Sequence, residues 1–236
     1  MKGTLFLIPN LLSDSNPNMS LPAETVSRIL ELRYFIIEEE RAARRFLVRL
    51  GMKELLSEIE FGFLNEHTQP DQVMNLLQPI KAGSHGGVLS EAGCPGVADP
   101  GSEVVRLAHE QGIQVKPLTG PSSILLALMA SGLNGQRFSF HGYLPIKAPD
   151  RIRRIKDLEQ RSKQLGETQL FIEAPYRNRQ LMTDLIAHLS PDTLLSVSAG
   201  LNSDKEYIRT APVWQWHNNV PDLHKIPTVF LFLKIN

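Results

Sequence analysis

The chain is poor in cysteine, poor in aromatic residues and free of long apolar runs. Cys94 is the only cysteine among 236 residues, which excludes disulfide bonds within the chain and suits a reducing compartment. No apolar run approaches the roughly 20 residues that a helix needs to cross a bilayer. The amino terminus also lacks the charged start and cleavage site of a signal peptide. We therefore expect a cytoplasmic protein with no membrane segment.

Signatures of metal and phosphate binding are absent as well. The seven histidines are scattered singly without partner cysteines, so we expect no metal. The chain has neither the GxxxxGK[ST] pattern of a phosphate-binding loop nor the GxGxxG pattern of a dinucleotide site. A small ligand of this protein is therefore expected to be a nucleoside without phosphates.

The net charge is zero, from 25 basic and 25 acidic residues, but the two halves differ. Residues 1–118 contain 11 basic and 15 acidic residues, whereas residues 119–236 contain 14 basic and 10 acidic residues. The positive excess of the second half is compatible with a nucleic-acid face. It is equally compatible with two domains, or two subunits, that attract each other.

Apolar periodicity divides the chain at the same place. In residues 1–118, short apolar runs alternate with helical patterns. The runs predict strands at 5–8, 34–37, 61–64, 88–89 and 115–118, and the patterns predict helices at 24–32, 41–50, 71–77 and 102–111. Strict alternation of strand and helix predicts an α/β domain with a parallel sheet and helices on both faces.

The alternation of strand and helix patterns does not continue in residues 119–236. Strand patterns occur at 138–140, 169–172, 194–198, 207–210 and 228–233, with fewer helices between them. A short polar link at 201–205 joins two of these strands, which predicts a hairpin over 194–210. We expect a second, α+β domain with a mixed sheet.

Two loops crowded with turn-forming residues stand out against this background. Residues 87–101 read GVLSEAGCPGVADPG, an apolar strand end followed by glycines and prolines, and residues 119–123 read TGPSS. Loops at the carboxyl ends of parallel strands share one edge of the sheet, where open α/β domains bind ligands. The pair is expected to grip one ligand together, although each loop by itself is also typical of an ordinary connection.

Six ordered blocks carry a family resemblance. They are SEAGCP at 90–95, ADPG at 98–101, TGPS at 119–122, ASGL at 130–133, FHGYLP at 140–145 and EAPYR at 173–177. Together they resemble the tetrapyrrole methylase superfamily, most closely its ribosomal branch, the small-subunit rRNA cytidine 2′-O-methyltransferases. EEER at 38–41 also fits that branch. The resemblance runs from about residue 5 to residue 177 and more faintly beyond.

The resemblance implies S-adenosylmethionine as cofactor, bound in the cleft between the two domains of the chain. It also implies that the protein forms a homodimer. It implies methylation of ribosomal RNA at a ribose 2′-hydroxyl. Small residues and freed backbone groups suit the amino acid end of that cofactor. The cofactor-binding residues that it implies are Pro9, Ser90, Glu91, Ala92, Gly93, Cys94, Pro95, Thr119, Gly120, Ser122, Ala174, Pro175 and Ala199.

This chain departs from the family pattern at several of these positions. Pro9 is followed directly by Asn10 and Leu11, where the family usually has a glycine-containing Pro-Ile-Gly-Asn-Leu turn. Glu91 replaces the usual aspartate, which lengthens the acidic arm by one methylene. Cys94 replaces the usual threonine and is expected to be a small packing residue, since no paired base is evident.

Transfer of a methyl group to a ribose hydroxyl needs a nearby proton acceptor, because the hydroxyl is a weak nucleophile. Glu91 is the first candidate because it lies within the ligand loop, and Glu39 is the second. An alternative for Glu39 is that it caps the helix that follows, whose first turn favours negative charge. His141 and Tyr176 lie in family-like blocks and are equally suited to packing.

Basic residues near these blocks are the candidate RNA contacts. The list is Arg41, Arg44, Lys147, Arg151 and Arg154. Arg151 and Arg154 are spaced to share a helical face that meets phosphates. Interspersed acidic residues make an ordinary solvated helix an alternative.

Two other functions stay open from the sequence. One is methylation of a tetrapyrrole-like small molecule, although an aromatic content of 7% leaves few rings to stack on a macrocycle. The other is a noncatalytic protein that binds S-adenosylmethionine or RNA without consuming either.

Overall fold

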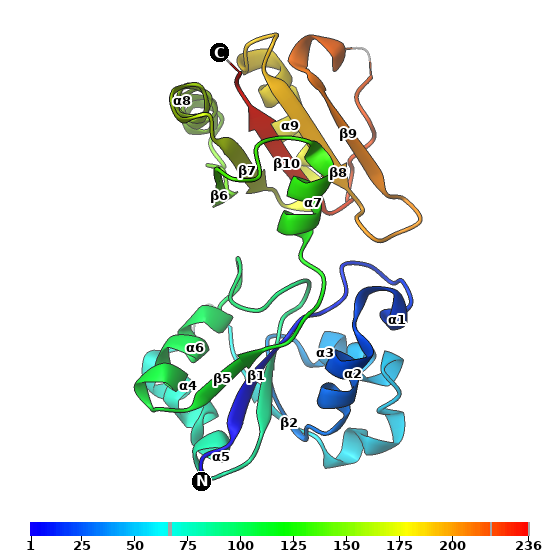
Figure 1. Ribbon diagram of the computed structural model, residues 1–236, viewed down its shortest axis with the longest axis vertical. Coiled ribbons are helices and arrows are strands. Elements are labelled where there is room, and N and C mark those ends of the chain that lie inside the picture. Colours follow the sequence, from blue (N-terminus) through cyan, green and yellow to red (C-terminus); the bar gives the residue numbers. More distant parts are fainter. Residues whose placement is uncertain (66–67, 218, 236) are drawn as a thin grey trace. The chain divides into compact units, whose positions relative to one another are not determined.

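The computed structural model describes residues 1–65, 68–217 and 219–235, and it divides into two compact units (Figure 1). Unit 1 comprises Met1–Ser122 and unit 2 comprises Ser123–Asn236. The loop at 119–122 belongs to unit 1, so this division falls slightly later than the predicted boundary after residue 118.

Unit 1 contains a five-stranded parallel sheet. Its strands are β1 (Thr4–Ile8), β2 (Tyr34–Ile37), β3 (Glu60–Phe63), β4 (Gly86–Leu89) and β5 (Gln114–Pro117). Their order is β3-β2-β4-β1-β5, and every neighbouring pair is parallel. Strand β2 lies between β3 and β4 and is buried along its whole length, which explains why it reads as an unbroken apolar run.

Helices cover both faces of this sheet, as predicted. They are α1 (Pro17–Ser20), α2 (Ala23–Leu30), α3 (Glu40–Arg49), α4 (Pro70–Leu76), α5 (Gln78–Lys81) and α6 (Gly101–Glu110). Alternate residues of a strand point to opposite faces. Accordingly, Phe35 of β2 packs in one core with Ile29 of α2 and Phe46 of α3. Its neighbour Ile36 packs in a second core with Val104 of α6.

The strand order creates a switch point between β2 and β4. After β2 the chain continues outward to β3, whereas after β4 it returns across β1 to β5. The two connections therefore leave the sheet in opposite directions. In open α/β sheets, such a point leaves a crevice at the carboxyl ends of the strands.

Unit 2 contains a mixed sheet, which confirms the predicted α+β class. Its strands are β6 (Phe138–Tyr143), β7 (Thr168–Ile172), β8 (Leu194–Ala199), β9 (Tyr207–Pro212) and β10 (Thr228–Leu233), in the order β6-β7-β10-β8-β9. Only β6 and β7 pair in parallel. The predicted hairpin is present as the antiparallel pair β8–β9.

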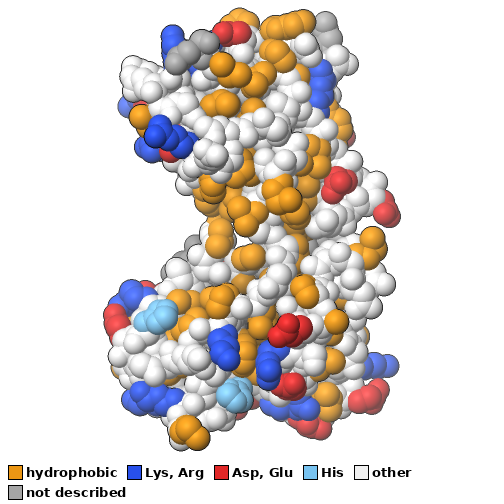
Figure 2. Space-filling view, viewed as in Figure 1, with side chains coloured by type: hydrophobic (Ala, Val, Ile, Leu, Met, Phe, Trp, Pro, Cys, Tyr) orange, Lys and Arg blue, Asp and Glu red, His pale blue; other side chains and the backbone are white. Residues whose placement is uncertain are grey.

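Three helices pack on this second sheet: α7 (Ser123–Ser131), α8 (Ala148–Leu165) and α9 (Asn178–His188). Helices α8 and α9 cover a core that contains Phe171, Phe230 and the fully buried Trp216. On the opposite face, the Thr210 hydroxyl donates a 2.8 Å hydrogen bond to the Ser131 carbonyl of α7. Figure 2 shows hydrophobic side chains gathered on the face that carries α7. No helix of the described residues is long and apolar enough to span a bilayer.

One predicted RNA contact lies inside this core. Arg151 of α8 is 5% exposed, and its guanidinium binds the carboxylate of Asp184 at 2.6 Å. The same guanidinium donates to the carbonyl of Ile146 at 2.6 Å. The sequence interpretation of Arg151 as an RNA contact is therefore wrong: apolar side chains at 155 and 158 turn this face of α8 toward the sheet and take Arg151 with them.

Replacement of Arg151 by alanine is expected to lower the free energy of unfolding of unit 2 by about 3–5 kcal/mol, because it leaves the buried Asp184 carboxylate without its cation. Both tryptophans, Trp214 and Trp216, lie in unit 2, so denaturant unfolding followed by tryptophan fluorescence measures the loss. The control is Arg153→Ala, since that side chain is 75% exposed and its removal is expected to cost less than about 0.5 kcal/mol. Equal stability of the two variants would contradict a structural role for Arg151.

Candidate functional site

The loops that follow β1 and β4 are joined to each other close to their strands. Asn10 and Gly93 exchange two backbone hydrogen bonds, of 2.8 Å and 3.1 Å. The side-chain amide of Asn10 also donates to the carbonyls of Ser90 and Glu91, at 2.9 Å and 3.1 Å. Asn10 thus holds the start of the predicted ligand loop against the end of the neighbouring strand.

The third predicted segment, 119–122, lies against the same two loops. A Cβ atom at Gly120 would overlap Cγ of Pro9 and lie 2.6 Å from its Cβ. The thiol of Cys94 contacts the carbonyl of Pro121 at 3.5 Å. Thr25 of α2 donates from its hydroxyl to the Thr119 carbonyl at 2.8 Å. The structure therefore brings together all the candidate cofactor residues of unit 1 at one edge of the sheet.

The loop after β4 is shaped by its own backbone. Gly93 and Gly96 have φ values of +71° and +77°, a region that residues with a Cβ rarely adopt. One carboxylate oxygen of Asp99 accepts hydrogen bonds from the backbone N–H groups of Gly96 and Gly101, at 2.6 Å and 2.8 Å. These bonds close the loop into a compact turn at the start of α6.

Cys94 has the environment of a packing residue. Burial raises the pKa of its thiol, which disfavours the nucleophilic thiolate. No group of three or more histidine, cysteine, aspartate or glutamate side chains is placed to hold a metal ion in the ranges that the structure describes.

A cavity of about 1020 Å³ opens beside the ligand loop, entirely within unit 1. Its walls come from three segments: residues 10–14 after β1, residues of 39–49 at the start and along α3, and residues 91–92 after β4. These are the carboxyl ends of β1, β2 and β4, so the cavity occupies the switch point of the sheet.

The two candidate bases occupy different positions on these walls. Glu39 is the N-cap of α3, and its two carboxylate oxygens accept hydrogen bonds from the backbone N–H groups of Arg41 and Ala42, at 2.8 Å and 2.6 Å. The capping alternative is therefore correct for Glu39. Glu91 is exposed on the cavity wall, and its carboxylate forms no ion pair with the residues that the structure describes.

The comparisons with known proteins address the family of this fold. A family model described as "Tetrapyrrole (Corrin/Porphyrin) Methylases" matches residues 28–213, which is most of the chain. The chain belongs to the tetrapyrrole methylase family.

Two curated relatives of this tetrapyrrole methylase carry the name "Ribosomal RNA small subunit methyltransferase I". The relative from Pseudomonas aeruginosa is 28% identical over 216 residues, which cover 92% of this chain and 72% of the relative. The relative from Escherichia coli O157:H7 is 29% identical, covering 90% of this chain and 70% of the relative. The chain is therefore an S-adenosylmethionine-dependent methyltransferase.

Solved structures show the same fold at low sequence identity. The structure titled "Crystal structure of the methyltransferase CobJ" is 15% identical, with a TM-score of 0.65, and covers 98% of this chain and 94% of its own. A uroporphyrin-III-C-methyltransferase from Thermus thermophilus is 19% identical, with a TM-score of 0.57. The match covers 99% of this chain and 93% of the Thermus chain. At these identities the likeness concerns the fold alone.

The remaining candidate cofactor residues of the tetrapyrrole methylase lie in unit 2. Ala174 and Pro175 follow β7, and Ala199 ends β8. Because β7 and β8 are both antiparallel to β10, their carboxyl ends share one edge of the sheet. The buried Asn178 side chain holds this edge by donating to the carbonyl of Ile226 at 2.7 Å.

Two of the three family-like blocks of unit 2 form hydrogen bonds that hold this sheet and its loops. In the EAPYR block, the buried carboxylate of Glu173 accepts from the Ala174 backbone N–H at 2.7 Å and from Arg177 at 2.9 Å. In the FHGYLP block, His141 shares a hydrogen bond of 2.7 Å with Gln169. Burial, together with the charges of Arg154 and Arg161, lowers the pKa of His141. The hydrogen bond to Gln169 fits the packing interpretation of His141.

The candidate RNA contacts differ in whether other side chains of the protein already bind their charged groups. The guanidinium of Arg44 pairs with Glu40 at 2.7 Å and lies over the ring of Phe61 at 5.1 Å. That of Arg154 contacts His141 at 3.3 Å. Arg41 and Lys147 are exposed and form no ion pair within the described part of the chain.

Sequence reasoning missed the contribution of Asn10, and the structure adds the position of Arg45. Asn10 entered the sequence analysis only as a departure from the family turn, yet it makes the bonds that join two loops. Arg45, exposed on α3, lines the cavity. Its spacing of four residues from Arg41 is the signal that places both side chains on one helical face.

Replacement of Gly120 by alanine is expected to push the 119–122 loop away from Pro9, because the new methyl group would overlap the proline ring. We expect a loss of about 1–3 kcal/mol of stability, as for other overpacked sites, and at least about tenfold weaker binding of S-adenosylmethionine. Scanning calorimetry and titration calorimetry measure the two effects. Gly135→Ala is the matched control, since nothing lies within 4 Å of its added methyl group. Unchanged cofactor affinity in the Gly120 variant would exclude this loop from the cofactor site.

Proposed function

We propose that this chain transfers a methyl group from S-adenosylmethionine to small-subunit ribosomal RNA, at a ribose 2′-hydroxyl, in the cytoplasm. The observation that supports this most directly is the alignment with the relatives named for that RNA, which spans 90–92% of the chain. A substantial cavity with arginines on its walls, beside the ligand loop, is consistent with a large anionic acceptor.

The geometry of unit 1 suits the proposed cofactor. The close approach of Gly120 to Pro9 and the positive φ of Gly93 leave backbone rather than side chains at the surface of the loops. Several of the predicted cofactor residues are buried, among them Pro9, Ser90, Gly93 and Pro95. These residues would set the shape of the loops rather than contact the cofactor. Glu91, Ala92, Cys94, Thr119, Gly120 and Ser122 would provide the contact surface in unit 1. Ala174, Pro175 and Ala199 remain predicted cofactor contacts.

When bound, S-adenosylmethionine supplies an electrophilic methyl group on its sulfonium. The ribose oxygen forms a bond to that carbon while the carbon–sulfur bond breaks, and the hydroxyl proton leaves to a base. We propose Glu91 as that base because its carboxylate is exposed on the cavity wall, whereas the Glu39 carboxylate is used in the helix cap. Alignment of the reactants and exclusion of water supply the rest of the acceleration.

Methylation of a tetrapyrrole is the second candidate activity, and binding without transfer is the third. The fold likeness to tetrapyrrole enzymes rests on 15–19% identity and does not favour one acceptor over another. An aromatic content of 7% leaves few rings to stack on a macrocycle, which favours RNA as the acceptor.

The purified chain is expected to transfer label from S-adenosylmethionine to small ribosomal subunits taken from cells that lack the gene. Tetrapyrrole precursors in a parallel reaction are expected to stay unlabelled. Glu91→Gln is expected to lower kcat by about 10²–10⁴-fold with little change in KM for the subunits, because the proton acceptor is lost while binding is kept. Label in the tetrapyrrole precursors would support the second candidate activity instead. Cofactor binding without transfer to either acceptor would support the third. Wild-type turnover of the Glu91 variant at every pH would remove Glu91 from the mechanism alone.

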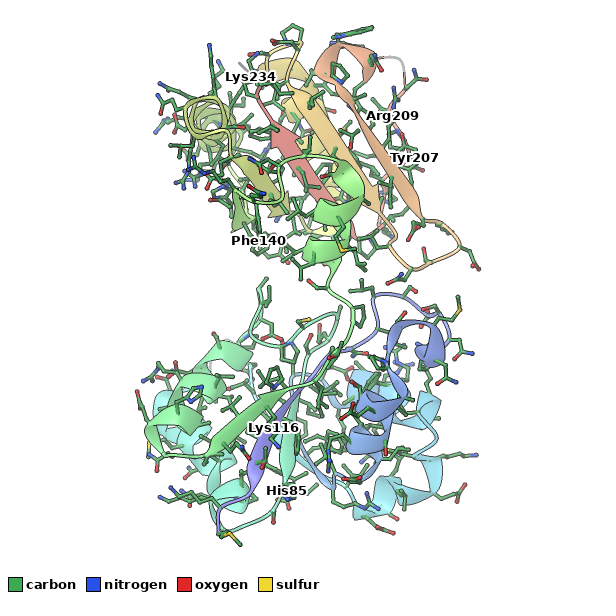
Figure 3. The ribbon with its side chains drawn as sticks, in the orientation of Figure 1. His85, Lys116, Phe140, Tyr207, Arg209 and Lys234 are labelled. Carbon is green, nitrogen blue, oxygen red and sulfur yellow. The ribbon has the colours of Figure 1, made fainter. Side chains whose placement is uncertain are left out.

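We further propose that two copies of the chain associate through the face of unit 2 that carries α7. The β-sheet register places Phe140, Leu170, Leu231, Ser196 and Thr210 in one row on this face. Helix α7 packs on β8, β9 and β10, while β6, which carries Phe140 in Figure 3, forms the far edge. The uncovered apolar side chains of this face include Met129 and Phe138, which are 79% and 40% exposed. Leu170, Ser196 and Leu231 of the row are buried, whereas exposed apolar side chains such as Met129 and Phe138 are typical of a protein interface.

Light scattering after size exclusion is expected to give the wild-type chain twice the 26.5 kDa of one copy. The double variant Met129→Glu, Phe138→Glu is expected to give the mass of one copy, because it buries two carboxylates in the interface. Met19→Glu is the matched control, because that methionine is 82% exposed on α1 of unit 1. A wild-type chain with the mass of one copy, or a double variant that still pairs, would show that this face does not join the copies.

A further inference from the structure

Two arginines that line the cavity of unit 1 have no carboxylate partner among the described residues. Four arginines line it, namely Arg41, Arg44, Arg45 and Arg49, together with the four acids Asp14, Glu39, Glu40 and Glu91. The numbers of arginines and acids are equal. However, not every arginine is paired with a carboxylate.

Three of the four acids are already engaged. Glu39 caps α3, Glu40 pairs with Arg44 at 2.7 Å, and Asp14 pairs with Arg49 at 3.3 Å. Arg49 also donates to the carbonyl of Ser15. Arg44 and Arg49 are thus partly neutralised within the protein.

Arg41 and Arg45 stand apart from these pairs. Both are exposed, both line the cavity, and neither forms an ion pair with a residue in the described ranges. Four residues apart on α3, they lie on the same helical face, with their Cβ atoms about 5–6 Å from each other. They therefore offer two adjacent guanidinium groups to one ligand.

The start of α3 itself is not the anion site. Its backbone N–H groups at Arg41 and Ala42 are occupied by the Glu39 carboxylate. An anion in this cavity must therefore be held by side chains. A guanidinium suits a phosphate in particular, because it donates two parallel hydrogen bonds to two oxygens.

We propose that this cavity is the subsite for the acceptor strand, in which Arg41 and Arg45 bind two consecutive phosphates of single-stranded RNA. The nucleotide between them then faces the Glu91–Ala92 wall beside the ligand loop. This inference rests on the proposed function, and it assigns the phosphate contacts to Arg41 and Arg45 rather than to the paired Arg44.

The cofactor is a poor alternative occupant for this cavity. It carries a single carboxylate and no phosphate, so it would leave one of the two guanidinium groups without a partner. A strand of RNA carries one phosphate per nucleotide and neutralises both. The cavity lies between α3 and the ligand loop, so a sugar hydroxyl of an RNA strand bound there can approach Glu91.

The test uses the full chain and the segment of small-subunit RNA that becomes labelled in the transfer experiment, as a single strand. Binding is measured at several salt concentrations. Each phosphate contact contributes about 0.7 to the slope of log affinity against log salt for single strands. The double variant Arg41→Ala, Arg45→Ala is therefore expected to lower that slope by about 1.4. Its KM for RNA is expected to rise about tenfold or more, and its affinity for S-adenosylmethionine is expected to stay as in wild type.

Two further variants separate local contacts from net charge and from folding. Arg106→Ala removes one positive charge from α6, where that side chain pairs with Glu103 and Glu110, and is expected to leave the slope unchanged. The double variant Arg41→Lys, Arg45→Lys keeps both charges and is expected to restore most of the slope but only part of the affinity, because lysine does not donate in pairs.

The outcomes distinguish this inference from the function on which it rests. If the wild-type chain labels no RNA, the proposed function fails and the acceptor subsite fails with it. If the wild-type chain labels RNA and the alanine double variant keeps its slope and KM, only the subsite is wrong. Weaker cofactor binding with an unchanged RNA slope would assign the cavity to the cofactor instead.

Discussion

The site of this methyltransferase depends on one short contact between two strand ends. Asn10 and Gly93 pair through their backbones, and the Asn10 amide holds two further carbonyls of the same loop. Asn10 is buried, so loss of these bonds would leave polar groups unsatisfied at a cost of about 1–3 kcal/mol each. Because the loop at 119–122 packs on Pro9, the position of a third segment follows from the same contact. The Asn10–Gly93 pair thereby links the loops that follow β1, β4 and β5.

Charge is distributed in this site by hydrogen bonding rather than by composition. The chain has equal numbers of acidic and basic residues, and the cavity lining is balanced as well. The helix cap and two ion pairs engage three carboxylates, which leaves two guanidinium groups and Glu91 exposed to solvent. The same principle acts in unit 2, where Glu167 accepts from Arg161 and Ser139 and has its pKa lowered to about 2. A residue's availability for a ligand is thus a property of its neighbours.

Much of the architecture follows from local pattern. Runs such as YFII at 34–37 are apolar because both faces of β2 are covered, and TVFLFL at 228–233 marks the centre of the second sheet. The switch from alternating strands and helices to a hairpin-containing half predicted the two classes of sheet. Helix α9 was not predicted from the sequence, since two of its buried residues, Asn178 and Asp184, are polar and weaken the apolar pattern.

The sequence by itself determined the family, the two loops and the parallel and mixed sheets, because turn residues and apolar periodicity are local properties. Tertiary structure decided which charged residues are free. Arg151 and Arg154 are three residues apart on one helix, yet Arg151 is buried against Asp184 and Arg154 is exposed. Glu39 and Glu91 are both acids that follow strands, yet one caps α3 and the other faces a cavity. The Arg151–Asp184 pair joins residues far apart in the chain, so only the packing of α8 against α9 brings them into contact.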